Sequence, residues 1–123
     1  MPLTPTTRSL FRRLRELAGG SRLVVPGEKP GKPISQNTMI FALYRMGYHS
    51  KLTVHGFRRT ASTILNESSL WDPDWIERQL AHVETNKIRG AYNAAQYLEP
   101  RARMMAWWSD YLGKAEDLAE LLG

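Results

Sequence analysis

Residues 55–92 read HGFRRTASTILNESSLWDPDWIERQLAHVETNKIRGAY, and the rest of the chain is organised around this stretch. Apolar residues repeat with a helical period over residues 54–67, which predicts a helix with one core-facing stripe. The stripe consists of Phe57, Ala61, Ile64 and Leu65. Thr53 is expected to cap this helix. A second helix is expected to begin at Asp72-Pro73, because an N-cap aspartate followed by a proline is a strong start signal.

The other apolar patterns are also helical. The second helix should bury Trp75, Ile76 and Leu80 and end near His82. Further helices are expected over residues 5–17, from Ser35 to about Met46 with Gly47 as the stop, and over residues 88–97. Another helix is expected from Pro100 onward, with Met104, Met105, Trp108 and Leu112 as its apolar face, and a tail helix is expected over residues 114–123. We therefore predict a mainly α, compact helical fold with at most a short extended segment near residues 22–26.

Length and composition narrow the class of protein. A chain of 123 residues corresponds to one domain, and its 42% of hydrophobic residues can fill one core. The absence of cysteine excludes disulfides and thiolate metal sites and fits a reducing cytosol. No apolar run reaches the length that spans a membrane. Residues 1–60 carry 11 Lys and Arg against 2 Asp and Glu, within a net charge of +5, so a polyanionic partner such as nucleic acid is indicated.

Two residues at the start of the predicted helix 54–67 are suited to binding a phosphate. His55 and Arg58 are three residues apart and therefore lie on one face of the helix. A guanidinium grips two phosphate oxygens, and a helix N-terminus adds partial positive charge. Taken alone, the pair also fits a helix-start histidine beside a solvated arginine, and that simpler interpretation is favoured without further context.

His82 and Tyr92 extend this set. His82 either caps the end of the preceding helix or donates to the same phosphate. A tyrosine phenol ionises only near pH ~10, so it is a poor nucleophile unless cations stabilise the phenolate. The alternative for Tyr92 is a half-buried ring with a wet hydroxyl, which is the role expected of the other four tyrosines.

Together these residues resemble the active site of tyrosine recombinases, and in particular of prophage and genomic-island integrases. The order and spacing of His55-x-x-Arg58, Leu80-Ala81-His82 and Tyr92 match that family. Flanking segments also look like the integrase sequence, namely 53–67, 75–82, 86–93, 97–101 and 104–112. The resemblance therefore covers about residues 2–113. It implies that the chain is the C-terminal part of a helical catalytic domain.

The resemblance also implies roles. Tyr92 would attack a DNA phosphodiester to form a 3′-phosphotyrosine, Arg58 and His82 would contact the phosphate, and His55 would assist proton transfer. Double-stranded attachment sites and other recombinase protomers in a synaptic complex would be the partners, in the nucleoid of the bacterial cytosol. No metal or nucleotide cofactor is implied, because the covalent intermediate conserves the bond energy. The residues expected to contact DNA elsewhere are Arg8, Arg12, Arg13, Arg59, Lys87 and Arg89.

The chain departs from the family pattern upstream. The family has another catalytic arginine and a lysine on a hairpin, both before a segment that Pro2-Leu3 resembles. No residue of this chain matches either one, and the core-binding and arm domains are not matched either. Ala94 stands where the family usually has an arginine. We therefore expect the 123-residue chain to be inactive by itself.

Two other classes of function remain open on the sequence. The basic first half allows a helical DNA-binding module without catalytic activity. A metal-dependent hydrolase could use His49, His55 and His82, although no histidine or carboxylate spacing typical of a metal site supports it.

Overall fold

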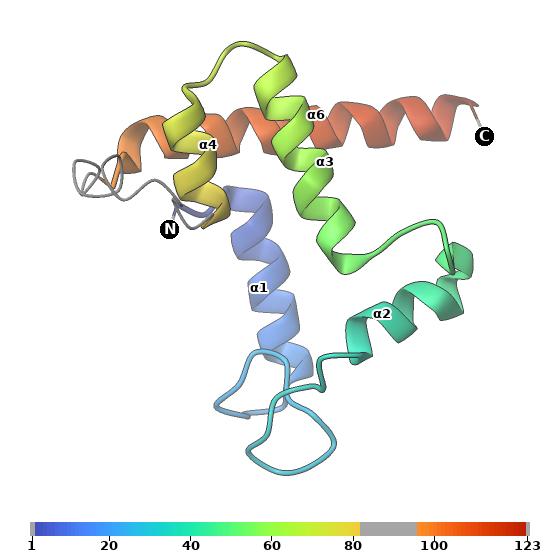
Figure 1. The fold of residues 1–123 in the computed structure, drawn as a ribbon. Coiled ribbons are helices and arrows are strands. Elements are labelled where there is room, and N and C mark those ends of the chain that lie inside the picture. The colour runs from blue at the N-terminus through green and yellow to red at the C-terminus, as the bar shows by residue number, and fades with distance from the viewer. Residues whose placement is uncertain (1, 82–95, 123) are drawn as a thin grey trace, which may run out of the picture. The chain divides into compact units, whose positions relative to one another are not determined.

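The computed structural model describes residues 2–81 and 96–122, and this part of the chain is mainly helical, as the sequence predicts (Figure 1). Its helices are α1 (Pro5–Leu17), α2 (Thr38–Leu43), one π-helical turn η1 (Tyr44–Tyr48), α3 (Val54–Glu67), α4 (Pro73–Leu80) and α6 (Leu98–Leu122). Within residues 2–81 and 96–122 no β-strand forms, and an isolated antiparallel β-bridge joins Pro26 and Pro33. None of the described helices is both long and apolar enough to cross a membrane.

The chain forms two compact units. We call Pro5–Thr60 the basic unit and Met1–Thr4 with Ala61–Gly123 the core unit. In the core unit α4 packs against α6 (Figure 1). One fully buried side chain comes from each of three helices: Leu65 from α3, Ile76 from α4 and Met104 from α6. Partly buried hydrophobic residues surround these three, namely Trp71, Trp75, Leu80, Trp107 and Trp108.

Both helix starts that the central stretch predicts are confirmed. Asp72 has extended backbone angles, and its side chain accepts a hydrogen bond from the Asp74 N–H at 2.8 Å, with Pro73 in the first turn. Thr53 accepts from the Gly56 N–H through its Oγ1 at 2.9 Å, and α3 begins at the next residue. Each cap depends on a side chain within three residues of the group it binds, which is why sequence alone locates it.

Helix α2 begins later than we predicted. Ser35 is not its N-cap, because α2 starts at Thr38 and Asn37 occupies the capping position without a side-chain hydrogen bond. Ser35 instead closes a turn, since its carbonyl accepts from the Thr38 N–H and its hydroxyl lies 3.0 Å from the Thr38 hydroxyl. Gly47 interrupts the helical angles with a φ of 87°, as expected of a stop residue.

The helix predicted to end near His82 does so, at Leu80. The helix predicted at Pro100 begins two residues earlier, at Leu98, and continues without a break through the tail to Leu122. Some burial predictions need correction. Phe57 is 54% exposed and Leu112 is 49% exposed, so neither belongs to the core. The leucines of α1 are exposed as well, and no residue of α1 is buried. The helix expected over residues 88–97 lies almost wholly outside the described residues.

Candidate active site and nucleic-acid surface

The first turn of α3 carries two of the four residues that the sequence places in the active site. His55 and Arg58 are both exposed and lie one helical turn apart on the same face. Gly56 between them allows the close cap, because a Cβ at this position would come 3.2 Å from the Thr53 hydroxyl oxygen. The helix start therefore presents an imidazole and a guanidinium beside the positive end of the helix dipole, which is a suitable arrangement for one phosphate.

The other two site residues, His82 and Tyr92, lie outside the described residues, as do Lys87 and Arg89. The structure does show where the chain leaves α4. Ala81 adopts left-handed angles (φ 51°) and its N–H bonds the carbonyls of Arg78 and Glu77, which ends the helix. Convergence of His82 and Tyr92 on His55 and Arg58 stays a prediction.

A buried arginine that the sequence analysis did not single out lies in the core unit. Arg101 on α6 is only 5% exposed. Its Nε and Nη2 donate to Oε1 of Gln79 at 3.0 and 2.9 Å, and its Nη1 donates to the carbonyl of Gln96 at 2.8 Å. Burial, and secondly the charge of Arg78, lower the pKa of Arg101 from its usual value. In the sequence, Arg101 could have been noticed because it ends segment 97–101, which resembles the integrase sequence.

The arginines expected to face DNA lie on exposed surfaces. Arg8, Arg12 and Arg13 are exposed on α1, and Arg59 is exposed on α3. Arg13 Nη1 lies 3.2 Å from Glu16 Oε2, but both side chains are largely solvated, so this pair is weak and leaves the guanidinium accessible. All four residues belong to the basic unit.

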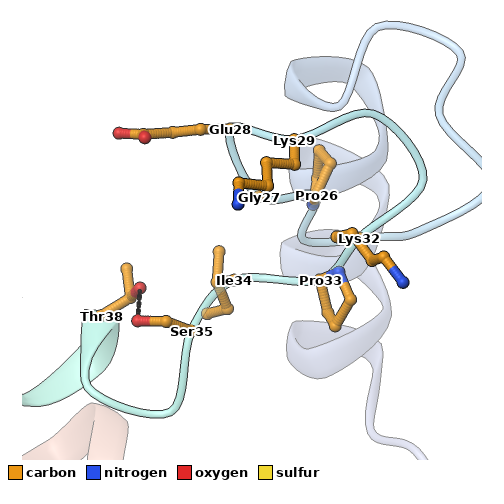
Figure 2. A pocket seen from close by; sticks show the side chains of 9 residues that line it. All are labelled: Pro26, Gly27, Glu28, Lys29, Lys32, Pro33, Ile34, Ser35 and Thr38. Carbon is orange, nitrogen blue, oxygen red and sulfur yellow. Dashed lines mark hydrogen bonds between the residues drawn. The ribbon is translucent and has the colours of Figure 1, made fainter.

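A cavity of about 400 Å³ in the basic unit is made by the loop before α2 (Figure 2). Its lining includes Lys29, Lys32 and the hydrogen-bonded pair Ser35 and Thr38, and none of the predicted active-site residues. Gly27 closes the loop by donating its N–H to the Lys32 carbonyl at 2.8 Å. Within the part of the chain that the structure describes, no three His, Cys, Asp or Glu side chains are grouped so as to hold a metal ion.

Comparison with known proteins identifies the family of this chain. The model of the phage integrase family matches residues 2–99 of this chain. The chain belongs to the phage integrase family. The match contains the first turn of α3 with His55 and Arg58, together with His82 and Tyr92, so the residues that resemble the recombinase site lie within the matched region.

Named integrases are similar over most of the chain. The integrase of Enterobacteria phage P4 is 43% identical over 116 residues, covering 91% of this chain and 26% of that protein. The prophage integrase IntA of Escherichia coli K12 is 41% identical over 123 residues, covering 99% of this chain and 29% of that protein. The prophage integrase IntZ of the same strain is 46% identical over 110 residues. The chain thus spans little more than a quarter of the length of these relatives. No solved structure matches it.

Proposed function

We propose that this chain supplies part of the catalytic site of a tyrosine recombinase that integrates or excises a prophage or genomic island. The observation that carries the proposal is the first turn of α3 in a member of the integrase family. There the Thr53 cap sets His55 and Arg58 on one exposed face. Tyr92 is the proposed nucleophile, and His82 is proposed as a second contact to the phosphate.

The proposed reaction exchanges one phosphoester for another. The phenolic oxygen of Tyr92 forms a bond to the scissile phosphorus, and its proton passes to a base, with His55 assisting. The bond from phosphorus to the 5′ oxygen breaks, and that oxygen takes up a proton to leave as a 5′-hydroxyl. Arg58 donates to the non-bridging oxygens, whose negative charge increases in the transition state. A 5′-hydroxyl of another strand then reverses the step and releases Tyr92.

The basic unit is proposed to hold the DNA backbone. If Arg8, Arg12, Arg13 and Arg59 each neutralise one phosphate, the plot of log affinity against log salt should have a slope of about −3.6, or a loss of about 10² in affinity between 50 and 200 mM salt. Fluorescence anisotropy with a labelled duplex measures this slope.

Single substitutions locate the DNA contact. Arg12→Gln should make the slope less negative by about 0.9, whereas Arg103→Gln on α6 should leave it unchanged. Binding that does not respond to salt would contradict a DNA-facing basic unit.

The catalytic proposal is tested by trapping the covalent intermediate. We define the restored form as this chain joined to the preceding part of the phage P4 integrase, so that the arginine and lysine of the family are present. With a nicked suicide duplex, the restored form should give a DNA adduct on denaturing gels, and the 123-residue chain alone should give none. The rate should fall by about 10²–10³ in Arg58→Gln, as for loss of one transition-state donor.

Substitution of tyrosines identifies the nucleophile. Tyr92→Phe should abolish the adduct, whereas Tyr111→Phe, a control at another tyrosine that is 40% exposed, should not. An adduct that survives Tyr92→Phe would point to Tyr97 instead. If the restored form binds DNA and never forms an adduct, the chain acts as a DNA-binding module, as its basic unit would also allow.

A further inference from the structure

The guanidinium of Arg101 joins two parts of the chain that are distant in sequence. One side of its planar fork, Nε and Nη2, holds the side chain of Gln79 on α4. The other side, Nη1, holds the main-chain carbonyl of Gln96 just before α6. The backbone N–H of Arg101 also donates to the Tyr97 carbonyl at 3.0 Å. One residue therefore fixes both α4 and the approach to α6.

These two attachment points flank the segment that carries the proposed nucleophile. Gln79 precedes His82 by three residues, and Gln96 follows Tyr92 by four. The backbone is left-handed on each side of that segment, at Ala81 (φ 51°) and at Tyr97 (φ 45°). Such angles are unfavourable for residues with a Cβ and persist where surrounding contacts hold them. The Tyr97 carbonyl accepts from the Arg101 backbone N–H, and Arg101 Nη1 binds the carbonyl of the preceding residue, Gln96.

The hydrogen bonds of Arg101 offset the cost of burying its charge. A buried charge is costly unless it is well bonded, and removal of the donor would leave the oxygens that it binds unpaired. The three bonds that Arg101 donates to described residues through its side chain end on neutral carbonyl oxygens. Arg103, two residues further along α6, is solvated and pairs with Glu99 in the ordinary manner of a surface arginine.

We propose that Arg101 is a positioning residue for the recombination chemistry: by fastening Gln79 to Gln96 it sets the separation of the two ends of the segment that presents His82 and Tyr92 to DNA. This inference rests on the proposed function for its catalytic consequence. The fastening itself can be tested without any activity. Arg103 is the matched control, because it lies on the same helix and its side chain is exposed.

The first experiment measures the separation directly. The chain has no cysteine, so spin labels can be attached at Ala81→Cys and Gln96→Cys alone, and the second substitution keeps the carbonyl that Arg101 binds. Pulsed electron paramagnetic resonance should show a single narrow distance distribution. Arg101→Gln should broaden it by about twofold or more, as expected when a tether is lost from local structure. Arg103→Gln should leave it unchanged. Arg101→Lys should be intermediate, because an ammonium keeps the charge and lacks the two-sided fork.

The second experiment measures adduct formation by the restored form at saturating DNA. Loss of positioning should lower the rate constant of Arg101→Gln by about 10-fold to 10²-fold, while the final amplitude and the affinity for DNA stay within about twofold of the wild type. A merely structural role would lower the amplitude along with the folded fraction, and would shift the unfolding midpoint of the core unit. Arg101→Lys should recover part of the rate.

The outcomes are distinguishable. An unchanged distance distribution in Arg101→Gln overturns the inference, as does an adduct whose amplitude falls while its rate constant does not. If the wild-type restored form gives no adduct at all, the proposed function fails, and the distance measurement still decides whether Arg101 fastens the two ends.

Discussion

Replacing Leu65 by alanine should destabilise the core unit far more than the same replacement at Leu121. Leu65 is 1% exposed and meets Ile76 and Met104, the fully buried side chains of α4 and α6. Leu121 lies on α6 and is 82% exposed. The two variants remove the same atoms, so their difference isolates burial.

The loss of stability expected in Leu65→Ala depends on the size of the cavity that the substitution leaves. Buried Leu→Ala replacements cost about 2.7–5 kcal/mol, the value depending on how far neighbours relax into the cavity. The side chains around Leu65 include large tryptophans that are only partly buried and can shift, so a cost near the lower end, about 3 kcal/mol, is expected. For a unit of this size that corresponds to a fall in Tm of about 12–24 °C. Leu121→Ala should stay within about 0.5 kcal/mol of the wild type.

The assay can be made specific for the core unit. All four tryptophans, Trp71, Trp75, Trp107 and Trp108, lie in it and none lies in the basic unit. Urea unfolding followed by tryptophan fluorescence therefore reports the core unit, while circular dichroism reports helices of both units. The fluorescence midpoint should move strongly in Leu65→Ala. A cost below about 1 kcal/mol, or an equal cost in Leu121→Ala, would refute the assignment of the core.

Two further predictions concern local structure. Asp72→Ala should cost about 1 kcal/mol in the fluorescence-monitored unfolding, because the Asp74 N–H loses its cap, whereas Asp72→Asn should retain most of the stability. Gly27→Ala should disrupt the loop before α2, since its Cβ would come 2.5 Å from the Pro33 carbonyl oxygen, at a cost of about 1–3 kcal/mol by calorimetry. Gly113→Ala meets no atom within 4 Å in mid-helix and should instead stabilise by about 0.5–1 kcal/mol; a loss there would contradict the described helix.

Sequence predicted the elements whose signals are local. The starts of α3 and α4 were located because Thr53 and Asp72 bind backbone groups only two or three residues away. The same rule failed at Ser35, where a second hydroxyl, that of Thr38, takes part in a competing turn and the helix begins after it. A capping residue therefore marks a helix start reliably only when no neighbouring side chain offers it another partner.

Burial was harder to predict than helicity. The period of α3 puts Phe57 and Leu65 on one stripe, yet Phe57 is 54% exposed and Leu65 is 1% exposed. Periodicity reports which face of a helix is apolar and does not report how far along the helix the packing partners extend. Leu65 is covered because α4 and α6 supply Ile76 and Met104 at that end, and this is information about tertiary structure.

Arg101 shows the same limit for the candidate site. Its partner Gln79 is 22 residues away, so no local pattern connects them. Pattern-based reasoning selects residues that resemble a known catalytic set, such as His55 and Arg58, and these are exposed and ready to meet a ligand. Arg101, which we propose to act through the two ends of the segment between Gln79 and Gln96, can be found only from its contacts in the structure. An apolar side chain in place of Arg101 would leave the Gln79 and Gln96 oxygens without this donor, so the guanidinium is needed for the contact itself. Its rigid two-sided fork can hold two chain ends at one fixed separation, and that property connects the packing of α4 on α6 to the chemistry proposed for Tyr92.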